Sequence, residues 1–228
     1  MSPRVARRVD ARYPPRRAPK NPRGLWRRTT LAEYRKPQPA WETVLDLDAL
    51  GAAEKENWVW KGATCFGPPY TRCVLSLSRG GADASVLREF DTQALRFIEA
   101  KDGGFVVAEA KSSLDWIDEN TVYIGTDFGP GSMTDSGYPR IVKRWQRGTP
   151  IDKAVTVFEG VAKDVAAGVS VDRTPGFERT VFSRATDFYN SKLWLLRGDK
   201  QVVIDVPSDA QFSFWRERVL IQLRSDWK

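Results

Sequence analysis

The residues of this sequence that are best suited to bind a ligand lie in one stretch, from Thr126 to Pro139. Three glycines, two carboxylates and several hydroxyl groups are concentrated there. This composition is typical of a loop, and loops carry a large share of ligand-binding residues. We therefore take Asp127, Asp135 and Tyr138 as candidates for contacting a ligand. The alternative is a plain inter-strand loop whose glycines serve turns with positive φ.

The same stretch does not match a phosphate site or a metal site. Gly129-Pro-Gly131 lacks the third glycine and the lysine of phosphate-binding loops, and a strand is expected to follow it instead of a helix. The aspartates in and beyond this stretch lack the alternating oxygen ligands of a calcium loop. Those considered are Asp127, Asp135, Asp172 and Asp187. We expect no metal site and no cofactor.

Groups for hydrolytic catalysis do not form a recognisable arrangement. The sequence contains no histidine, which excludes a Ser-His-Asp or Cys-His site lying wholly within this chain. It also contains no Gly-x-Ser-x-Gly motif for a nucleophilic serine. Ser132 or Ser136 could in principle pair with Lys143, but no motif supports such a dyad. We expect no catalytic residue in this chain.

Cys65 and Cys73 fall at the two ends of a predicted hairpin loop, so they can approach each other. Two cysteines cannot form a disulfide framework, and no signal segment indicates an oxidising compartment. We therefore expect two reduced thiols and a cytoplasmic protein. No run of about 18 apolar residues is present, so we expect no membrane partner. Tryptophans recur in equivalent strands, which favours a role in packing: Trp26, Trp145 and Trp194.

The positive charge of the chain is concentrated at its start. Residues 1–36 hold twelve basic and two acidic side chains, a surplus of ten, so the net charge of +7 leaves −3 for the rest. Residues 1–22 contain five prolines and few large apolar side chains, which predicts a disordered arm with the fold beginning near Arg23. Such an arm could be an extension without function, could bind polyanions or could serve targeting.

The remaining sequence consists of short β-rich runs separated by turns, which predicts an all-β fold. We expect complete four-stranded units at residues 57–100, 112–160 and 165–206, and half units at 23–46 and 211–228. This repeat is typical of β-propeller blades, although a two-sheet sandwich has similar strand spacing. The expected first strands are Asn57–Gly62, Ser112–Ile117, Val165–Val171 and Gln211–Arg216. A short surface helix is predicted for Asp46–Asn57 and a tight hairpin turn for Asp118–Asn120.

Several of these stretches resemble the prolyl oligopeptidase family, in particular its amino-terminal propeller. The stretches are Gly24–Leu50, Glu56–Gly62, Ser76–Asp91, Leu114–Trp145 and Phe188–Leu196. The resemblance implies a seven-bladed propeller that covers an α/β-hydrolase domain with a Ser-Asp-His triad and admits only peptides. Against that pattern, we expect the basic arm to take the place of the leading segment, and the later blades and the catalytic domain to be absent from this chain.

We therefore expect residues 23–228 to form a partial propeller of about three complete blades and two half-blades. It would be the substrate-gating portion of a serine-type endopeptidase, inactive alone, binding peptides only within a full-length enzyme and requiring a hydrolase domain or complementary chain. The alternative is a free-standing β-repeat interaction module with a polyanion-binding arm, although nucleic acid is the less favoured partner.

The half units are also expected to expose apolar side chains and to cause self-association, because an open arc leaves its terminal sheets uncovered. These side chains are Leu25, Trp26, Val44, Phe212, Phe214, Val219 and Ile221.

Overall fold

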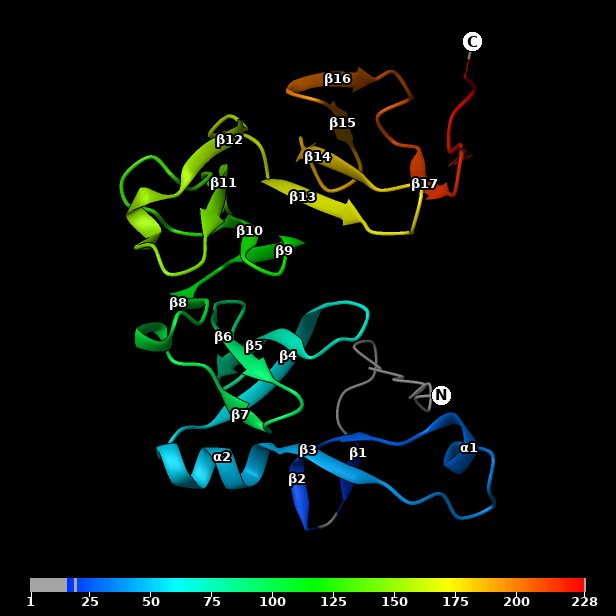
Figure 1. The fold of residues 1–228 in the computed structure, drawn as a ribbon. Helices are drawn as coiled ribbons and strands as arrows, with labels where there is room; N and C mark the ends of the chain where they lie inside the picture. Colours follow the sequence, from blue (N-terminus) through cyan, green and yellow to red (C-terminus); the bar gives the residue numbers. More distant parts are fainter. Residues whose placement is uncertain (1–15, 19, 228) are drawn as a thin grey trace. The chain divides into compact units, whose positions relative to one another are not determined.

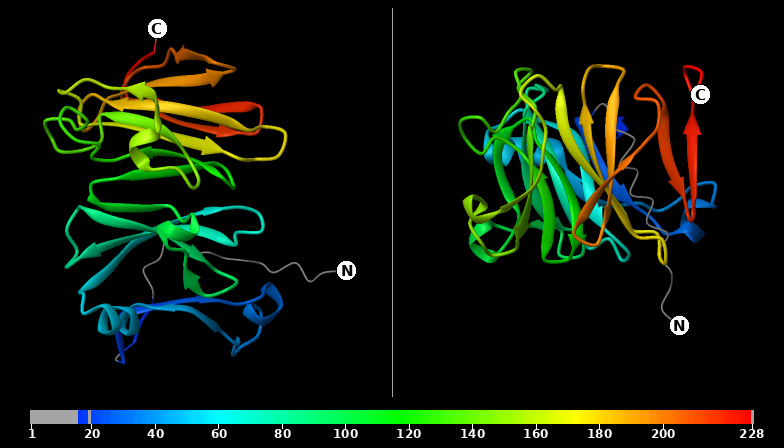
Figure 2. Two further views of the ribbon diagram at one scale, coloured as in Figure 1. Left: turned by 60° about the vertical axis from the view of Figure 1, so that its left-hand side comes forward. Right: turned by 90° about the horizontal axis from the view of Figure 1, so that it is seen from above.

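The computed structural model describes residues 16–18 and 20–227, and it confirms a partial β-propeller built from antiparallel sheets (Figures 1 and 2). The chain divides into two compact units, one ending at Ala110 and one beginning at Lys111. In both, the dense β-branched and aromatic runs form strands, and the Gly-, Asp- and Asn-rich segments form the turns between them.

The first unit opens with a three-stranded sheet in the order β1-β2-β3. Its strands are β1 (Arg16–Ala18), β2 (Asn21–Arg28) and β3 (Glu42–Asp46), and a single helical turn, α1 (Leu31–Tyr34), lies between β2 and β3. The predicted boundary at Arg23 was therefore too late, because β1 pairs with β2 inside the segment assigned to the arm. Residues 1–15 and 19 of that segment lie outside the described residues.

The predicted surface helix is confirmed as α2 (Leu47–Glu54). Asp46 caps its amino terminus by accepting hydrogen bonds from two backbone N–H groups of the first turn, at 2.9 and 3.0 Å. Lys55 ends the helix in a left-handed conformation, with φ of 55°. The side chain of Leu47 is completely buried, so one end of the helix is part of the core.

The second sheet of the first unit corresponds to the predicted unit 57–100, but its fourth strand is divided. Its strands are β4 (Trp58–Phe66), β5 (Arg72–Arg79), β6 (Ser85–Asp91), β7 (Arg96–Phe97) and β8 (Val106–Ala110). Both β7 and β8 pair with β6, and a 3₁₀ turn at Ala100–Asp102 separates them. The buried carboxylate of Glu89 accepts the Phe105 N–H at 2.9 Å, which holds this interrupted edge in place.

The two sheets of the first unit pack face to face around one hydrophobic cluster. Trp26 on β2 lies 5.2 Å from Trp60 and 5.8 Å from Phe90, measured between ring centroids. Trp26 and Val44 are only 8% and 5% exposed, so the prediction that they face solvent was wrong. The physical reason is that this sheet is covered on one face by β4–β6, which removes both side chains from water.

The second unit contains two four-stranded sheets and one hairpin (Figure 2). The first sheet comprises β9 (Ser113–Asp118), β10 (Thr121–Gly125), β11 (Ile141–Gln146) and β12 (Val155–Glu159). The second comprises β13 (Ala166–Asp172), β14 (Arg179–Ala185), β15 (Ser191–Arg197) and β16 (Lys200–Ile204), and the hairpin comprises β17 (Gln211–Trp215) and β18 (Arg218–Gln222). These strands confirm the predicted units, and the Asp118–Asn120 turn joins β9 to β10 as expected.

The core of the second unit lies between its two four-stranded sheets. Phe182 on β14 is 1% exposed; its ring stacks on Phe158 at 5.0 Å and meets Tyr123 edge-on at 5.6 Å. Trp194 packs against Phe158 at 5.1 Å, which confirms that the recurring tryptophans serve packing. Each sheet therefore hides one face against its neighbour, as stacked blades do.

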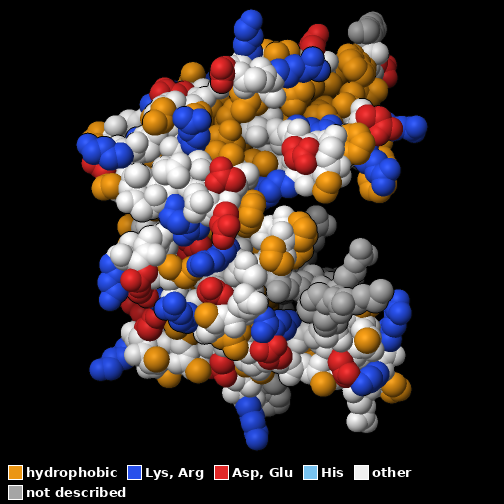
Figure 3. Space-filling view, viewed as in Figure 1, with side chains coloured by type: hydrophobic (Ala, Val, Ile, Leu, Met, Phe, Trp, Pro, Cys, Tyr) orange, Lys and Arg blue, Asp and Glu red, His pale blue; other side chains and the backbone are white. Residues whose placement is uncertain are grey.

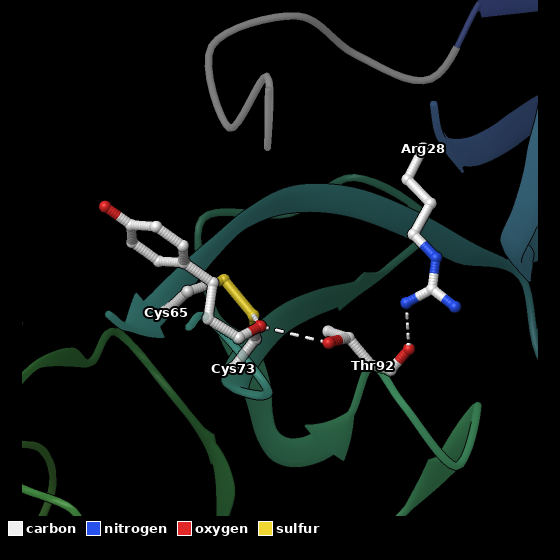
Figure 4. Close-up of a disulfide and its surroundings, with 5 residues drawn as sticks. Arg28, Cys65, Cys73 and Thr92 are labelled. Atoms are coloured by element: carbon white, nitrogen blue, oxygen red, sulfur yellow. Dashed lines mark hydrogen bonds between the residues drawn. A yellow bond between two sulfur atoms is a disulfide. The ribbon is translucent and has the colours of Figure 1, made fainter. Parts of the chain in front are cut away.

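The prediction of two reduced thiols was wrong, because Cys65 and Cys73 form a disulfide. They are directly opposite each other in the β4–β5 register, with a Cα–Cα distance of 3.9 Å. The sequence placed them at the two ends of one hairpin, and the register then determined that their side chains meet. Figure 4 shows the bond beside Thr92, at the base of the hairpin loop.

Candidate functional site

The candidate residues lie in the loop between β10 and β11, and hydrogen bonds within the loop fix its first turn. The Asp127 carboxylate accepts the Gly129 N–H at 2.9 Å. Ser132 is 3% exposed; its hydroxyl donates to the Gly129 carbonyl at 2.6 Å and accepts the Phe128 N–H at 2.8 Å. The Ser132 hydroxyl is therefore a structural element of this turn.

A second turn follows and is attached to the segment between β12 and β13. The Thr134 N–H donates to the Tyr138 carbonyl at 2.8 Å, and the Thr134 hydroxyl donates to the Val165 carbonyl at 2.9 Å. The Asp135 N–H donates to the Ala162 carbonyl, also at 2.8 Å. These bonds attach the loop to the segment that joins β12 to β13, so the loop is held at its second turn.

Arg140 clamps the base of the loop. Its guanidinium donates to the Gly131 carbonyl at 2.7 Å and to the Gly160 carbonyl at 3.2 Å, and it lies 3.4 Å from the Glu159 carboxylate. One side chain thus joins the first turn of the loop to the end of β12. Charged donors make stronger hydrogen bonds to carbonyl oxygens than neutral donors do, so this clamp orders the loop further.

The three predicted site residues occupy different parts of this loop. Asp127 lies in the first turn with an exposed carboxylate, whereas Asp135 and Tyr138 lie in the second turn. The Asp135 carboxylate accepts from Lys163 at 2.7 Å, and this hydrogen bond raises the pKa of the Lys163 ammonium. The Lys111 ammonium lies 4.1 Å from the centre of the Tyr138 ring. Asp135 and Tyr138 therefore share one turn, and Asp127 lies in the other.

The geometry does not form the Ser–Lys dyad considered from the sequence. The Lys143 ammonium lies over the Phe128 ring, 4.3 Å from its centre, as a cation–π contact. Ser132 is engaged with its own turn, and the Ser136 carbonyl accepts from Lys111 at 3.4 Å. The loop as described offers hydrogen-bonding groups and aromatic surface for binding, and not an activated nucleophile.

Two partly buried ion pairs support the second unit, and neither was predicted from the sequence. Asp115 on β9 accepts from Arg173 at 2.7 Å and from the Val171 N–H at 2.8 Å; burial raises the pKa of its carboxyl group. Asp164 accepts from Arg184 at 2.7 and 3.0 Å. Burial also raises the pKa of Asp164, but the hydrogen bonds from Arg184 and a backbone N–H outweigh burial, and the pKa lies below its ordinary value.

Sequence alone gives no signal for these pairs. Asp115 and Arg173 lie 58 positions apart, and only the packing of β9 against β13 brings them together. Within residues 16–18 and 20–227, no group of three or more acidic, cysteine or histidine side chains could hold a metal ion. The same residues include no helix with the length and apolar character needed to cross a membrane.

Comparison with protein families gives one match that spans almost the whole chain. Residues 7–222 match the family described as "Prolyl oligopeptidase, N-terminal beta-propeller domain". An uncharacterized peptidase of Sinorhizobium fredii is 40% identical over 211 residues, covering 90% of this chain and 29% of that protein. An uncharacterized peptidase of Rickettsia prowazekii is 33% identical over 226 residues, covering 92% and 31%.

Solved structures agree with this match. A post-proline cleaving enzyme from Rickettsia typhi superposes with a TM-score of 0.83 at 29% identity, covering 92% of this chain and 32% of that enzyme. Oligopeptidase B from Leishmania major superposes with a TM-score of 0.60 at 9% identity, covering 83% and 25%, which supports the fold alone. The chain spans less than a third of the length of each of these proteins. By its fold and its sequence, the chain belongs to the prolyl oligopeptidase family, where it corresponds to the N-terminal β-propeller domain.

Proposed function

We propose that this chain is the substrate-gating propeller portion of a serine-type endopeptidase that cleaves peptides at proline, and that it lacks hydrolytic activity by itself. The observation that carries the proposal is the TM-score of 0.83 to a post-proline cleaving enzyme, over 92% of this chain but only 32% of that enzyme. The reacting groups are proposed to come from an α/β-hydrolase domain, since this chain has no histidine to act as the general base.

The proposed contribution of this chain is to select and contact peptide substrates. The β10–β11 loop supports this role, because its turns are held rigid while the Asp127 carboxylate remains exposed and the Tyr138 ring is half-buried. Carboxylates accept backbone N–H groups of a peptide, and an aromatic ring provides an apolar contact surface for proline. Asp135 is the weaker candidate, since the Lys163 ammonium balances its charge, whereas the Asp127 carboxylate accepts hydrogen bonds from uncharged groups of its own turn.

A complementary chain or domain is proposed to cover the exposed strands at the end of the second unit. Val202 and Val203 on β16 are 45% and 61% exposed, and Val219 and Leu220 on β18 are 46% and 55% exposed. Hydrophobic side chains gather over this part of the surface in Figure 3. The hairpin β17–β18 is two strands wide, whereas the two sheets before it are four strands wide. An apolar edge strand of this kind favours pairing with a further strand.

In the isolated chain, the same surface is proposed to cause self-association. Burying a valine or leucine side chain contributes about 1.5–3 kcal/mol, so several exposed side chains provide a substantial driving force. Phe212 and Phe214 contribute less than expected from the sequence, because they contact each other at 4.8 Å and Phe214 is covered by Arg179. The cytoplasm is kept as the proposed compartment, although the Cys65–Cys73 disulfide does not support it, because thiol reductants there keep most cysteines reduced.

The activity part of the proposal is tested with the purified chain and a fluorogenic proline-containing peptide. We expect no hydrolysis above that of buffer. Turnover that persists through purification and disappears when one serine, such as Ser136, is replaced by alanine would overturn the proposal. The free-standing interaction module remains the alternative, and tight binding of the chain to a polyanion in a filter assay at physiological salt would favour it.

A further inference from the structure

The Cys65–Cys73 disulfide closes a short loop whose two ends differ in accessibility. Cys73 on β5 is completely buried, whereas Cys65 on β4 is half-buried. The loop between them carries the exposed residues Pro68, Pro69 and Tyr70, and Tyr70 has a φ of 63°. A bulky residue held in the left-handed region requires support from its surroundings, and the disulfide lies three residues away.

The closed loop is connected by hydrogen bonds to the first sheet of the same unit. The Thr92 hydroxyl donates to the Tyr70 carbonyl at 3.0 Å, and the Thr92 N–H donates to the Thr71 carbonyl at 2.9 Å. The Thr92 carbonyl in turn accepts the Arg28 guanidinium of β2 (Figure 4). Arg28 also forms two hydrogen bonds with Glu42 of β3, at 2.6 and 2.8 Å. A continuous path therefore runs from the disulfide loop to β2 and β3.

We propose that the Cys65–Cys73 disulfide is a clasp that thiols can open and close. When it is closed, it keeps residues 66–72 ordered, and through the hydrogen bonds of Thr92 and Arg28 it keeps this loop attached to strands β2 and β3. With the bond closed, the loop presents the Tyr70 carbonyl to Thr92 in a fixed position. With the bond open, the loop samples more conformations, and the Thr92 hydroxyl is without the Tyr70 carbonyl as its acceptor for part of the time. The hydrogen bond from Arg28 to the Thr92 carbonyl is then weakened as well. The clasp is a redox-sensitive device that is separate from peptide gating.

The chemistry requires a dithiol reductant, and its steps balance. One thiolate of the reductant attacks the Cys65 sulfur, forms a mixed disulfide with it and releases the Cys73 thiolate, which takes up a proton. The second thiol of the reductant then attacks the reductant sulfur that is bonded to Cys65, and Cys65 leaves as a thiol. The protein gains two electrons and two protons, and the reductant becomes a disulfide. Cys65 is the site of attack because Cys73 is out of reach of solvent.

The bond itself is tested by differential alkylation of the full chain. Protein purified in air without reductant is treated with N-ethylmaleimide in denaturant, before and after incubation with dithiothreitol, and its intact mass is measured. We expect no modified cysteine before reduction and two after it. Two modified cysteines before reduction, in protein prepared in air, would overturn the proposal.

The coupling is tested by amide hydrogen exchange on the oxidised and reduced chain. We expect exchange in residues 66–72 to rise by roughly tenfold on reduction, with a smaller rise of about threefold around Arg28 in β2. The strands β9–β12 of the other unit provide an internal reference and should keep their rates. Unchanged exchange in residues 66–72 after complete reduction would contradict the clasp.

Two variants separate the clasp from a general loss of stability. Thr92→Val keeps the side-chain shape but removes the hydroxyl donor, so reduction should still loosen residues 66–72 while the response around Arg28 falls by at least half. The double variant Cys65→Ala, Cys73→Ala should exchange like the reduced protein and should not respond to dithiothreitol. A response around Arg28 that survives Thr92→Val in full would refute the path through the Thr92 hydroxyl, because the loop would then act without that hydrogen bond.

Discussion

The free energy of unfolding of the second unit should depend on Phe182, which packs between its two four-stranded sheets, more than on any surface aromatic residue. Phe182 is 1% exposed, stacks on Phe158 at 5.0 Å and meets Tyr123 edge-on at 5.6 Å. Replacing it by alanine removes about 1.5–3 kcal/mol of burial and two aromatic contacts of about 0.5–1.5 kcal/mol each. These contributions add up to about 2.5–6 kcal/mol, a range that contains the roughly 3–5 kcal/mol lost at other buried phenylalanines.

The matched control is Phe188→Ala, because Phe188 has the same side chain, lies in the connection after β14 and is 90% exposed. Its replacement should change stability by less than about 0.5 kcal/mol. Urea unfolding followed by tryptophan fluorescence measures both variants, since Trp194 packs against the same Phe158 ring. If Phe182→Ala and Phe188→Ala lost similar stability, or if neither lost more than about 1 kcal/mol, the packed seam between the sheets would be refuted.

Three further outcomes are expected. The folded-state pKa of Asp164 is lowered, so its carboxylate stabilises the fold above the ordinary pKa near 4, and this contribution is lost as pH falls through the folded-state pKa. Asp164→Asn should therefore reduce the loss of stability at acidic pH. An unchanged loss of stability at acidic pH would contradict the ion pair with Arg184. Reducing the Cys65–Cys73 bond, which links residues eight positions apart, should lower the free energy of unfolding by about 2.6 kcal/mol, and a urea midpoint unaffected by dithiothreitol would argue against this. Val203→Lys should weaken self-association by roughly tenfold or more, as measured by light scattering over a concentration series. A wild-type chain that stays monomeric at high concentration would refute self-association through this exposed apolar surface.

Most of the strands could be predicted from the sequence because local pattern and fold agree there. The segments that became β9–β16 carry dense β-branched and aromatic runs, and Asp, Asn and Gly mark their ends, so positions and order followed from the chain alone. The same holds for α2, since Asp46 is a strong helix cap.

The failures arose where tertiary contacts override local preference. Arg16–Ala18 reads as part of a basic, proline-rich arm, and only pairing with β2 makes it a strand. The divided fourth strand, β7 and β8, depends on the buried carboxylate of Glu89 holding the Phe105 backbone, which no periodicity reveals. Trp26 was expected at an open face, but its burial depends on a neighbouring sheet.

The candidate site shows the same division. The glycine and aspartate content of residues 126–139 was enough to locate a loop, and Asp135 and Tyr138 do lie in one turn. The anchoring of that loop could not be predicted, because Thr134 and Arg140 bond to carbonyl groups more than eight positions away. The disulfide needed the exact β4–β5 register, which the two cysteine positions allow but do not determine.

A hybrid enzyme can show whether this chain works as the propeller portion of a peptidase together with a hydrolase domain. Residues 16–222 replace the matching segment of the Rickettsia typhi post-proline cleaving enzyme, and hydrolysis of a proline-containing peptide is measured for the hybrid, the parent enzyme and this chain alone. We expect the hybrid to hydrolyse the peptide and the chain alone not to. Turnover by the chain alone, or a folded hybrid without turnover beside an active parent, would contradict this expectation.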